Sequence, residues 1–458
     1  MAERTARTKI QNAGLVLGLA ALVVTLISEA PAGLPPAAWT VAGVLALMAL
    51  WWSTEALPLA VTALMPLAVL PLLDAVTAET LAGGYGNTTL FLILGGFLLA
   101  LAMERSELHR RIAYNIVVHA GGHPQGLVLG MMCATGFVSM WVSNTSTSLM
   151  MLPVAMSIAA IVAPDPAVDD RNAHNFSAAI VLCVAYSATI GGLGTLIGTP
   201  TNALVVGFMK QNYGITVSFA QWLTFGLPVV LLLMPIAWLV LVRVVFPFKL
   251  GSQVTAGAAL RSALVALGPM SRAERRVTAI LLLTAGAWIL SPLLKLLPGL
   301  VGLNDTTIAL VAGISLFLVP NGGEQGGALL DGKDLKRVPW PVLLLFGGGL
   351  ALAAAIQDSG LSEFIGEALT GLATLPLIAL IAAIVTLIVF WTEVNSNVAT
   401  AATFMPILAA IAAGTHYPVL QLVAPAVMAS SCGFMLPAGT PPNAIVFGTG
   451  RLKMSEML

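Results

Sequence analysis

Residues 139–154 read SMWVSNTSTSLMMLPV, and about 250 residues later residues 391–406 read WTEVNSNVATAATFMP. Each stretch carries a Ser-Asn pair inside an apolar segment, Ser143-Asn144 in the first copy and Ser396-Asn397 in the second. A double glycine precedes the pair by 48 residues in the first copy and by 49 residues in the second. These matched spacings indicate that the chain consists of two repeats.

A Gly-Thr-Pro motif follows each Ser-Asn pair, at residues 198–200 and again at residues 439–441. The threonine lies 56 residues after the serine in the first copy and 44 residues after it in the second. The difference of 12 residues matches a polar loop at residues 164–175 (PDPAVDDRNAHN), which only the first copy contains. Proline removes an amide donor and glycine lets the backbone unwind, so each motif predicts a break in an otherwise apolar helix.

The composition is that of a protein whose solvent is lipid. The chain is 58% hydrophobic and only 9% charged, with a mean hydropathy of +0.95, whereas soluble domains are about 25% charged. Long apolar runs recur along the whole chain. The sequence therefore predicts an all-α polytopic membrane protein with about ten spanning helices.

The distribution of charge predicts the orientation in the membrane. All of the 20 Lys and Arg residues except Lys210 and Lys295 can lie on one side of a single topology. By the positive-inside rule, that side and the N-terminus are cytoplasmic, in the cell inner (plasma) membrane. In this topology each Ser-Asn stretch enters and leaves on the same side, the first from the cytoplasm and the second from outside. We therefore expect two inverted-topology repeats, each with a re-entrant helical hairpin and a broken helix.

The two repeats differ at their C-terminal ends. After its Gly-Thr-Pro motif the first repeat continues through an apolar span at residues 221–246. The second repeat reaches the end of the sequence at Leu458, 17 residues after Pro441. The sequence therefore predicts that an eleventh helix is missing and that the chain is truncated.

A Ser-Asn pair at a hairpin tip places a hydroxyl and an amide at the start of a helix, where free N–H groups carry partial positive charge. Two such tips facing each other near the membrane midplane predict a site for an anion with two carboxylates. Hydroxyl, amide and carbonyl oxygens also suit a hard cation such as sodium, and no carboxylate or imidazole cluster predicts a transition metal. Either motif alone is an ordinary cap or turn, but their matched duplication favours a secondary transporter.

Five stretches of the chain resemble the divalent anion/sodium symporter family, whose members move dicarboxylates, citrate or sulfate. They are WWSTEALPLAVTALMP (51–66), SMWVSNTSTSLMMLPV (139–154), GTLIGTPTNALV (194–205), WTEVNSNVATAATFMP (391–406) and CGFMLPAGTPPNAIVFG (432–448). The resemblance covers nearly the whole chain. It implies a homodimer in which each protomer has a scaffold domain and a transport domain that moves like an elevator.

The resemblance also implies where the substrate and the ions bind. The substrate site would consist of Ser143, Asn144, Thr145, Ser396, Asn397 and Val398, bordered by Thr440 and Pro441. One sodium ion would bind at Ser139, Ser143, Asn144 and the backbone near Gly198. The other would bind at Thr392, Asn395, Asn397 and the backbone near Gly439. Val398 replaces the threonine of a Ser-Asn-Thr tip, which removes a hydrogen bond worth about 1 kcal/mol.

With these expectations, the chain divides into five segments. Scaffold helices 1–4 would occupy residues 1–120, with the third of them at residues 56–73, and scaffold helices 7–9 would occupy residues 274–371. The two transport halves would occupy residues 121–246 and 372–458, and a cytoplasmic linker would occupy residues 247–273.

The predicted function is sodium-coupled symport of C4-dicarboxylates such as succinate, malate or fumarate. A citrate or sulfate symporter, a sodium-independent dicarboxylate exchanger and a non-transporting sensor are the alternatives. We expect no enzyme, because the sequence has neither a His-Glu-x-x-His motif nor a Gly-x-Ser-x-Gly motif. The expected partners are a small di- or tricarboxylate anion, the lipid bilayer and a second copy of the chain, and no basic patch predicts nucleic-acid binding.

Overall fold

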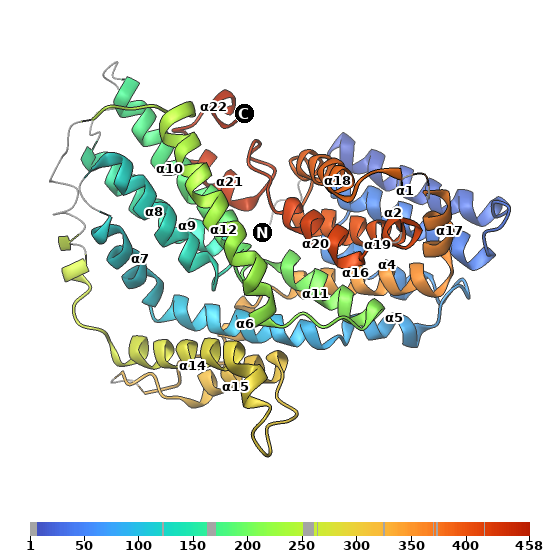
Figure 1. The fold of residues 1–458 in the computed structure, drawn as a ribbon, viewed down its shortest axis with the longest axis horizontal. Coiled ribbons are helices and arrows are strands. Elements are labelled where there is room, and N and C mark those ends of the chain that lie inside the picture. Colours follow the sequence, from blue (N-terminus) through green and yellow to red (C-terminus); the bar gives the residue numbers. More distant parts are fainter. Residues whose placement is uncertain are drawn as a thin grey trace. The chain divides into compact units, whose positions relative to one another are not determined.

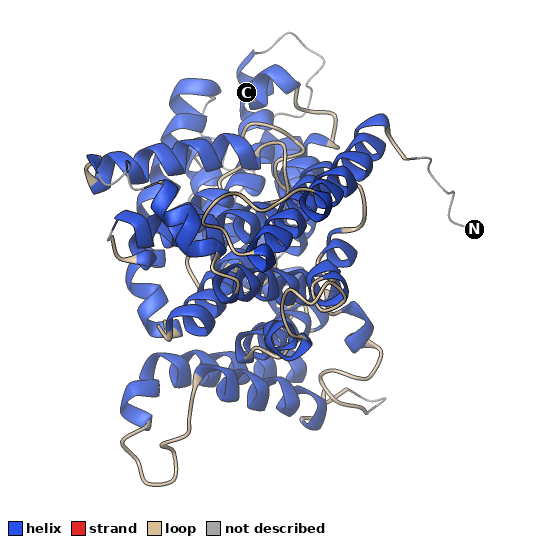
Figure 2. Cartoon of the chain, turned by 90° about the vertical axis from the view of Figure 1, so that its right-hand side faces the viewer, coloured by secondary structure: helices blue, strands red, loops and turns tan. Residues whose placement is uncertain are grey.

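The structure is a computed structural model that describes residues 7–120, 123–162, 171–250, 261–262, 264–323, 326–369, 371, 374–415 and 417–458. Over these residues the chain forms helices joined by loops, with no strand (Figure 2). The first part of the loop predicted at residues 164–175 and much of the linker predicted at residues 247–273 lie outside the described residues.

The chain divides into two compact units, and each unit contains parts of both repeats. Unit 1 consists of Met1–Leu90, Pro200–Val217 and Pro339–Gly433. Unit 2 consists of Phe91–Thr199, Ser218–Val338 and Phe434–Leu458. The predicted scaffold and transport domains are defined by which parts of the chain move during transport. That division stays a prediction.

Unit 1 is organised around helix α16, which packs against α2, α3, α4, α5, α11, α17 and α19. Close packing is possible because α16 has small residues where neighbours approach. A Cβ atom on Gly348 would lie 2.0 Å from the carbonyl oxygen of Ala63, and one on Gly347 would lie 2.5 Å from the ring of Tyr85. The second double glycine therefore serves helix packing. The helices of unit 1 are α1 (Lys9–Ile27), α2 (Pro36–Thr54), α3 (Leu59–Thr62), α4 (Met65–Val69), α5 (Ala78–Tyr85), α11 (Pro200–Tyr213), α16 (Trp340–Asp358), α17 (Leu361–Ala368), α18 (Leu377–Thr392), α19 (Asn397–Thr415) and α20 (Val419–Ser430).

Unit 2 is organised around helix α10, which packs against α8, α9, α12 and α21 (Figure 1). The contact with α8 is a glycine-on-glycine approach, since a Cβ atom on Gly191 would lie 2.2 Å from the carbonyl oxygen of Gly136. Gly95, from the first double glycine, packs in the same way against Ala309. The helices of unit 2 are α6 (Thr88–Arg105, whose first residues belong to unit 1), α7 (Leu108–His119), α8 (Pro124–Ser139), α9 (Asn144–Val162), α10 (Arg171–Gly192), α12 (Phe219–Leu239), the π-helix η1 (Val240–Val245), α14 (Arg272–Leu294), α15 (Asp305–Leu318), the 3-10 helix η2 (Asp334–Arg337), α21 (Pro441–Phe447) and α22 (Met454–Met457).

Nine helices in the described part of the chain are long and apolar enough to cross a membrane. The predicted all-α polytopic membrane fold is therefore confirmed. One expected element differs: the single helix expected over residues 56–73 is two short helices, α3 and α4. Pro58 precedes α3 and Pro66 lies in the first turn of α4, so the missing amide donors interrupt a continuous helix.

The repeated motifs form the predicted local structures. Helices α8 and α9 form one hairpin (hairpin 1), and α18 and α19 form the other (hairpin 2). The first broken helix ends at Gly192 and resumes at Pro200, and the second ends at Ser430 and resumes at Pro441. The side of the membrane from which each hairpin enters stays a prediction.

Candidate functional site

The tip of hairpin 1 presents the first Ser-Asn pair at the start of α9. The Ser139 hydroxyl, at the end of α8, donates a hydrogen bond of 2.8 Å to the side-chain oxygen of Asn144. The Ser143 hydroxyl accepts a bond of 3.3 Å from the Ser146 amide. Ser143, Asn144 and Thr145 are all half-buried. The bond from Ser139 therefore fixes an asparagine that is still open to a ligand.

The tip of hairpin 2 repeats this arrangement in unit 1. The Thr392 hydroxyl lies 2.9 Å from the side-chain oxygen of Asn397 and donates to it, with the same separation of five residues. The same hydroxyl also donates to the Ser430 carbonyl oxygen at 2.6 Å, so its one proton is shared between the two acceptors and connects the tip to the end of α20. Ser396, Asn397 and Val398 are half-buried, like their counterparts in hairpin 1.

All the residues predicted for the first sodium ion lie in unit 2, and the structure connects them. A Cβ atom on Gly192, the last residue of α10, would lie 2.4 Å from the side-chain oxygen of Asn144. A Cβ atom on Gly198 would in turn lie 2.5 Å from the Gly192 carbonyl oxygen. Beside them, the Thr195 hydroxyl donates to the Met140 carbonyl at 2.5 Å. The unwound segment after α10 therefore packs directly against the tip of hairpin 1. Side-chain and carbonyl oxygen atoms lie where the two segments meet.

Three of the four residues predicted for the second sodium ion, Thr392, Asn395 and Asn397, lie together at the tip of hairpin 2. Asn395 is only 8% exposed, and its side-chain oxygen has no hydrogen-bond partner among the described residues. A buried amide oxygen of this kind is a suitable ligand for a hard cation. Gly439, the fourth residue, belongs to unit 2, and its position beside the other three stays a prediction.

The broken helices pack against the hairpins of the opposite repeats. In unit 2, α21, which begins at Pro441, packs against α9 of hairpin 1 and against α10. In unit 1, α11, which begins at Pro200, packs against α19 of hairpin 2 and against α20. The hydroxyls of Thr201 and Ser431 are 2.8 Å apart at the latter contact. Each hairpin therefore packs against a helix of the opposite repeat, while the facing of the two tips across the site stays a prediction.

The second Gly-Thr-Pro motif starts its helix with a side-chain cap. Thr440 is the N-cap residue of α21, and its hydroxyl accepts a 3.2 Å bond from the Asn443 amide. The amide group of Asn443 also donates to the Leu436 carbonyl at 3.0 Å, which stabilises the unwound segment before the helix. Thr440 is buried and Pro441 is exposed, so only the proline is open at the surface of this unit.

Sequence reasoning missed Gly192 and the contact between Thr201 and Ser431. The signal for Gly192 was present, because Gly191-Gly192 is a further double glycine six residues before Gly198. The contact between Thr201 and Ser431 joins residues 230 positions apart and has no local signal.

Positive charge at the two tips comes from the backbone. Helices α9 and α19 begin at the asparagines, so their first-turn N–H groups lie at the tips. No Lys, Arg or His lies within either tip segment, residues 139–148 or 392–400. Among the described residues there is no group of three or more His, Cys, Asp or Glu side chains that fits a metal ion. The tips therefore offer helix N-termini to an anion and hydroxyl and amide oxygens to a cation. The second tip segment also contains the buried carboxyl group of Glu393.

Known proteins with similar sequences and structures agree with this architecture. Residues 9–458 match the family model described as the sodium:sulfate symporter transmembrane region. The chain is 40% identical over 454 residues to the sodium-dependent dicarboxylate transporter SdcS of Staphylococcus aureus strain USA300, covering 98% of this chain and 87% of that protein. The same identity and coverage hold for SdcS of strain NCTC 8325.

A solved structure resembles the fold. The crystal structure of the Alcanivorax borkumensis YdaH transporter, described as having an unusual topology, matches with a TM-score of 0.52 and 17% identity, over 82% of each chain. Together, the family match over nearly the full chain and the duplicated hairpin tips identify the protein class. The chain belongs to the sodium:sulfate symporter family, the divalent anion/sodium symporters that its repeated motifs resemble.

Proposed function

We propose that this chain is a secondary active transporter that carries a C4-dicarboxylate, such as succinate, malate or fumarate, together with sodium ions. The observation that carries the proposal is the duplicated tip, in which a hydroxyl five residues earlier holds an asparagine at a helix N-terminus. The relative SdcS is named as a sodium-dependent dicarboxylate transporter, which supports the same substrate class and ion.

The two tips suit an anion with a carboxylate at each end. Each carboxylate would bind at one helix N-terminus, with the hydroxyl of Ser143 or Ser396 and the amide of Asn144 or Asn397 as further donors. The site would therefore bind the two negative charges of the substrate without a buried Arg or Lys side chain. Thr440 and Pro441 would border the substrate, and Val398 would contribute an apolar contact.

Sodium would use the oxygens of the same tips. Asn144 and Asn397 each direct a side-chain oxygen toward the residue five positions earlier, and a sodium ion at that oxygen would hold the tip in one conformation. We infer that sodium binds first, orders the tip and adds positive charge to the anion site. Shared residues would then couple the two bindings, since each ligand stabilises the conformation that the other requires.

The wider mechanism is part of the same proposal. The chain would work as a homodimer in the plasma membrane, with the N-terminus in the cytoplasm and with elevator-type alternating access. Inverted repeats that meet near the membrane midplane support alternating access in general.

The test is uptake of radiolabelled succinate into proteoliposomes with and without an inward sodium gradient. We expect sodium-driven uptake by the wild type, and loss of uptake in Asn144→Ala and in Asn397→Ala. The control is Asn115→Ala, because among the described residues that side chain is exposed and donates to the carbonyl of Arg111 within its own helix. Equal uptake with choline in place of sodium would reject sodium coupling. If unlabelled citrate or sulfate competes and succinate does not, the C4-dicarboxylate assignment is wrong.

A further inference from the structure

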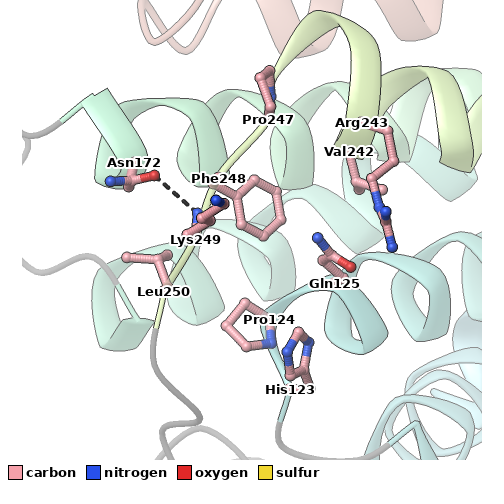
Figure 3. Close-up of a pocket in the computed structure, with 10 residues that line it drawn as sticks. All are labelled: His123, Pro124, Gln125, Asn172, Val242, Arg243, Pro247, Phe248, Lys249 and Leu250. Atoms are coloured by element: carbon pink, nitrogen blue, oxygen red, sulfur yellow. Dashed lines mark hydrogen bonds between the residues drawn. The ribbon is translucent and has the colours of Figure 1, made fainter.

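Unit 2 contains a cavity of about 530 Å³ at the end of hairpin 1 that is remote from its tip (Figure 3). Its walls include His123 and Gln125 at the start of α8, Arg243 in η1, and Phe248 and Lys249 in the segment after η1. Helix α8 runs from Pro124 to Ser139, about 22 Å at 1.5 Å per residue. The cavity is therefore separate from the Ser-Asn tip and from any ligand bound there.

The cavity is lined by basic groups. His123, Arg243 and Lys249 line it, and no carboxylate is among the described residues of its wall. Within the part of the chain that the structure describes, neither the guanidinium of Arg243 nor the ammonium of Lys249 has a hydrogen-bond or ion-pair partner. The N-terminus of α8 also lies here without a side-chain cap, so its partial positive charge adds to theirs. Arginine forks and helix N-termini are the usual groups that bind phosphate.

The walls of the cavity are held in place by interactions between its elements. The Lys249 amide donates to the side-chain oxygen of Asn172 at 2.9 Å, the bond drawn in Figure 3. The Asn175 amide group donates to the Pro247 carbonyl at 2.7 Å, and the rings of Phe176 and Phe248 meet edge to face at 5.4 Å. These contacts fix the segment after η1 to α10, so Lys249 is attached to an ordered wall.

The cavity lies at the end of a membrane span. Helix α12 and η1 together form the 27-residue apolar span Phe219–Val245, and Arg243 is near its end. Leu239 and Val240, four and three residues before Arg243, are exposed, and so are Leu232 (63%) and Val244 (72%). Trp238 in the same stretch donates from its indole to the Gln125 carbonyl at 3.0 Å, and tryptophan is enriched at membrane–water interfaces.

We propose that this cavity binds the phosphate of an anionic phospholipid, whose acyl chains lie against the exposed apolar face of α12 and η1. Free inorganic phosphate offers the same charged group but gains nothing from the apolar face beside the cavity. The positive-inside rule predicts that this end of α12 is cytoplasmic, and the cytoplasmic leaflet carries anionic lipid. The site takes a phosphodiester through Arg243, Lys249 and the start of α8.

The experiment measures lipid binding by the full chain in detergent. The thermal unfolding midpoint and the number of retained lipids in native mass spectra are followed as phosphatidylglycerol, phosphatidylcholine or inorganic phosphate is added. The variant is Arg243→Gln/Lys249→Gln, which leaves the fold intact because both side chains are exposed. The control is Arg275→Gln/Lys336→Gln, which removes the same charge from exposed positions of unit 2 outside the cavity.

We expect phosphatidylglycerol to stabilise the wild type more than phosphatidylcholine does, with the apparent affinity reduced about 10-fold or more in the variant and unchanged in the control. Equal losses in variant and control would show a non-specific charge effect and overturn the proposal. Stabilisation by inorganic phosphate that matches that by phosphatidylglycerol, lost in the same variant, would replace the lipid by a soluble anion. Equal stabilisation by the two lipids would also overturn it.

Discussion

Ser139 and Asn144 are joined across the tip of hairpin 1 by a hydrogen bond of 2.8 Å from the serine hydroxyl to the asparagine side-chain oxygen. In hairpin 2 the pair Thr392 and Asn397 makes the same bond at 2.9 Å. A serine in one repeat and a threonine in the other serve the same role, because only the hydroxyl is needed. The bond sets the orientation of an asparagine that we propose binds both sodium and the substrate.

Removing either hydroxyl is expected to weaken sodium binding. In Ser139→Ala and in Thr392→Val, the sodium concentration for half-maximal succinate uptake should rise about 5- to 10-fold, since one such bond contributes about 1 kcal/mol. Ser157→Ala and Thr386→Val are the controls, because both side chains are exposed on the helices of the same hairpins. An unchanged sodium dependence in both tip variants would show that the hydroxyls have only a local structural role.

A methyl group at Gly192 is expected to displace the side chain of Asn144 at the tip of hairpin 1. The Cβ atom of Gly192→Ala would lie 2.4 Å from the Asn144 side-chain oxygen, well inside van der Waals contact, so the side chain must rotate away. We expect sodium-driven uptake to fall at least 10-fold while the protein still inserts and purifies. Gly286→Ala is the matched control in a membrane helix, since a Cβ atom there meets nothing within 4 Å. Normal uptake by Gly192→Ala would mean that Asn144 does not need its observed position.

The repeated motifs were sufficient to predict the hairpins and the broken helices. A Ser-Asn pair and a Gly-Thr-Pro motif change the backbone locally, so their positions in the sequence become the ends of α8, α9 and α21 in the structure. The two short helices α3 and α4 were not predicted, because a proline in an apolar run has the same hydropathy signal whether it kinks a helix or ends it.

The contacts between the repeats could not be read from the sequence. The packing of α21 against α9, and of α11 against α19, joins residues of opposite repeats and depends on the three-dimensional pairing of inverted halves. The packing partners of the double glycines could not be predicted from the sequence either. Their regular spacing marks the repeat, but only the structure shows that Gly348 lies against Ala63 and Gly95 against Ala309.

Helices α7 and α14 are joined by an ion pair that should contribute strongly to stability. The Arg111 side chain donates to Glu274 at 2.7 Å and to the Gly268 carbonyl at 2.9 Å, and the two charged side chains are only 14% and 8% exposed. Arg111→Ala leaves a buried carboxylate without its partner, so we expect a loss of about 3 kcal/mol and a clear drop in the thermal unfolding midpoint.

The neighbouring Arg110→Ala is the control for this variant. Arg110 pairs with Glu107 at 3.0 Å, but the side chains are 44% and 58% exposed, so the loss should be below about 1 kcal/mol. Similar midpoints for the Arg111 and Arg110 variants would contradict the importance of the buried pair.

The contact between α22 and α10 is expected to depend on pH. A ring nitrogen of His174 lies 2.7 Å from the Glu456 carboxylate, which also accepts a bond from the Lys453 amide. Partial burial acts to raise the pKa of Glu456, but the bonds from Lys453 and His174 outweigh it, so the pKa lies below its ordinary value. A carboxylate with a lowered pKa stabilises the folded state at neutral pH, and this contribution is lost as pH falls through the lowered pKa.

Hydrogen exchange can measure this effect. Relative to the core of α10, amides of residues 453–458 should keep their protection from pH 7 to pH 5 and lose it as the pH falls below the ordinary carboxyl pKa of 4.5, after correction for the intrinsic exchange rate. In Glu456→Gln the protection should be lower at pH 7 and nearly independent of pH. An identical pH dependence in the variant would assign the effect to another group.

Val398 is expected to limit the affinity for the anion. It occupies the position in hairpin 2 that Thr145 occupies in hairpin 1, and both residues are half-buried one position after the asparagine. Threonine has nearly the same shape as valine and adds a hydroxyl donor. Val398→Thr should therefore lower the KM for succinate about 5-fold, from one added hydrogen bond of about 1 kcal/mol. The reverse change, Thr145→Val, should raise the KM by a similar factor. If KM moves in the same direction in both variants, residue volume rather than the hydroxyl determines the affinity at this position.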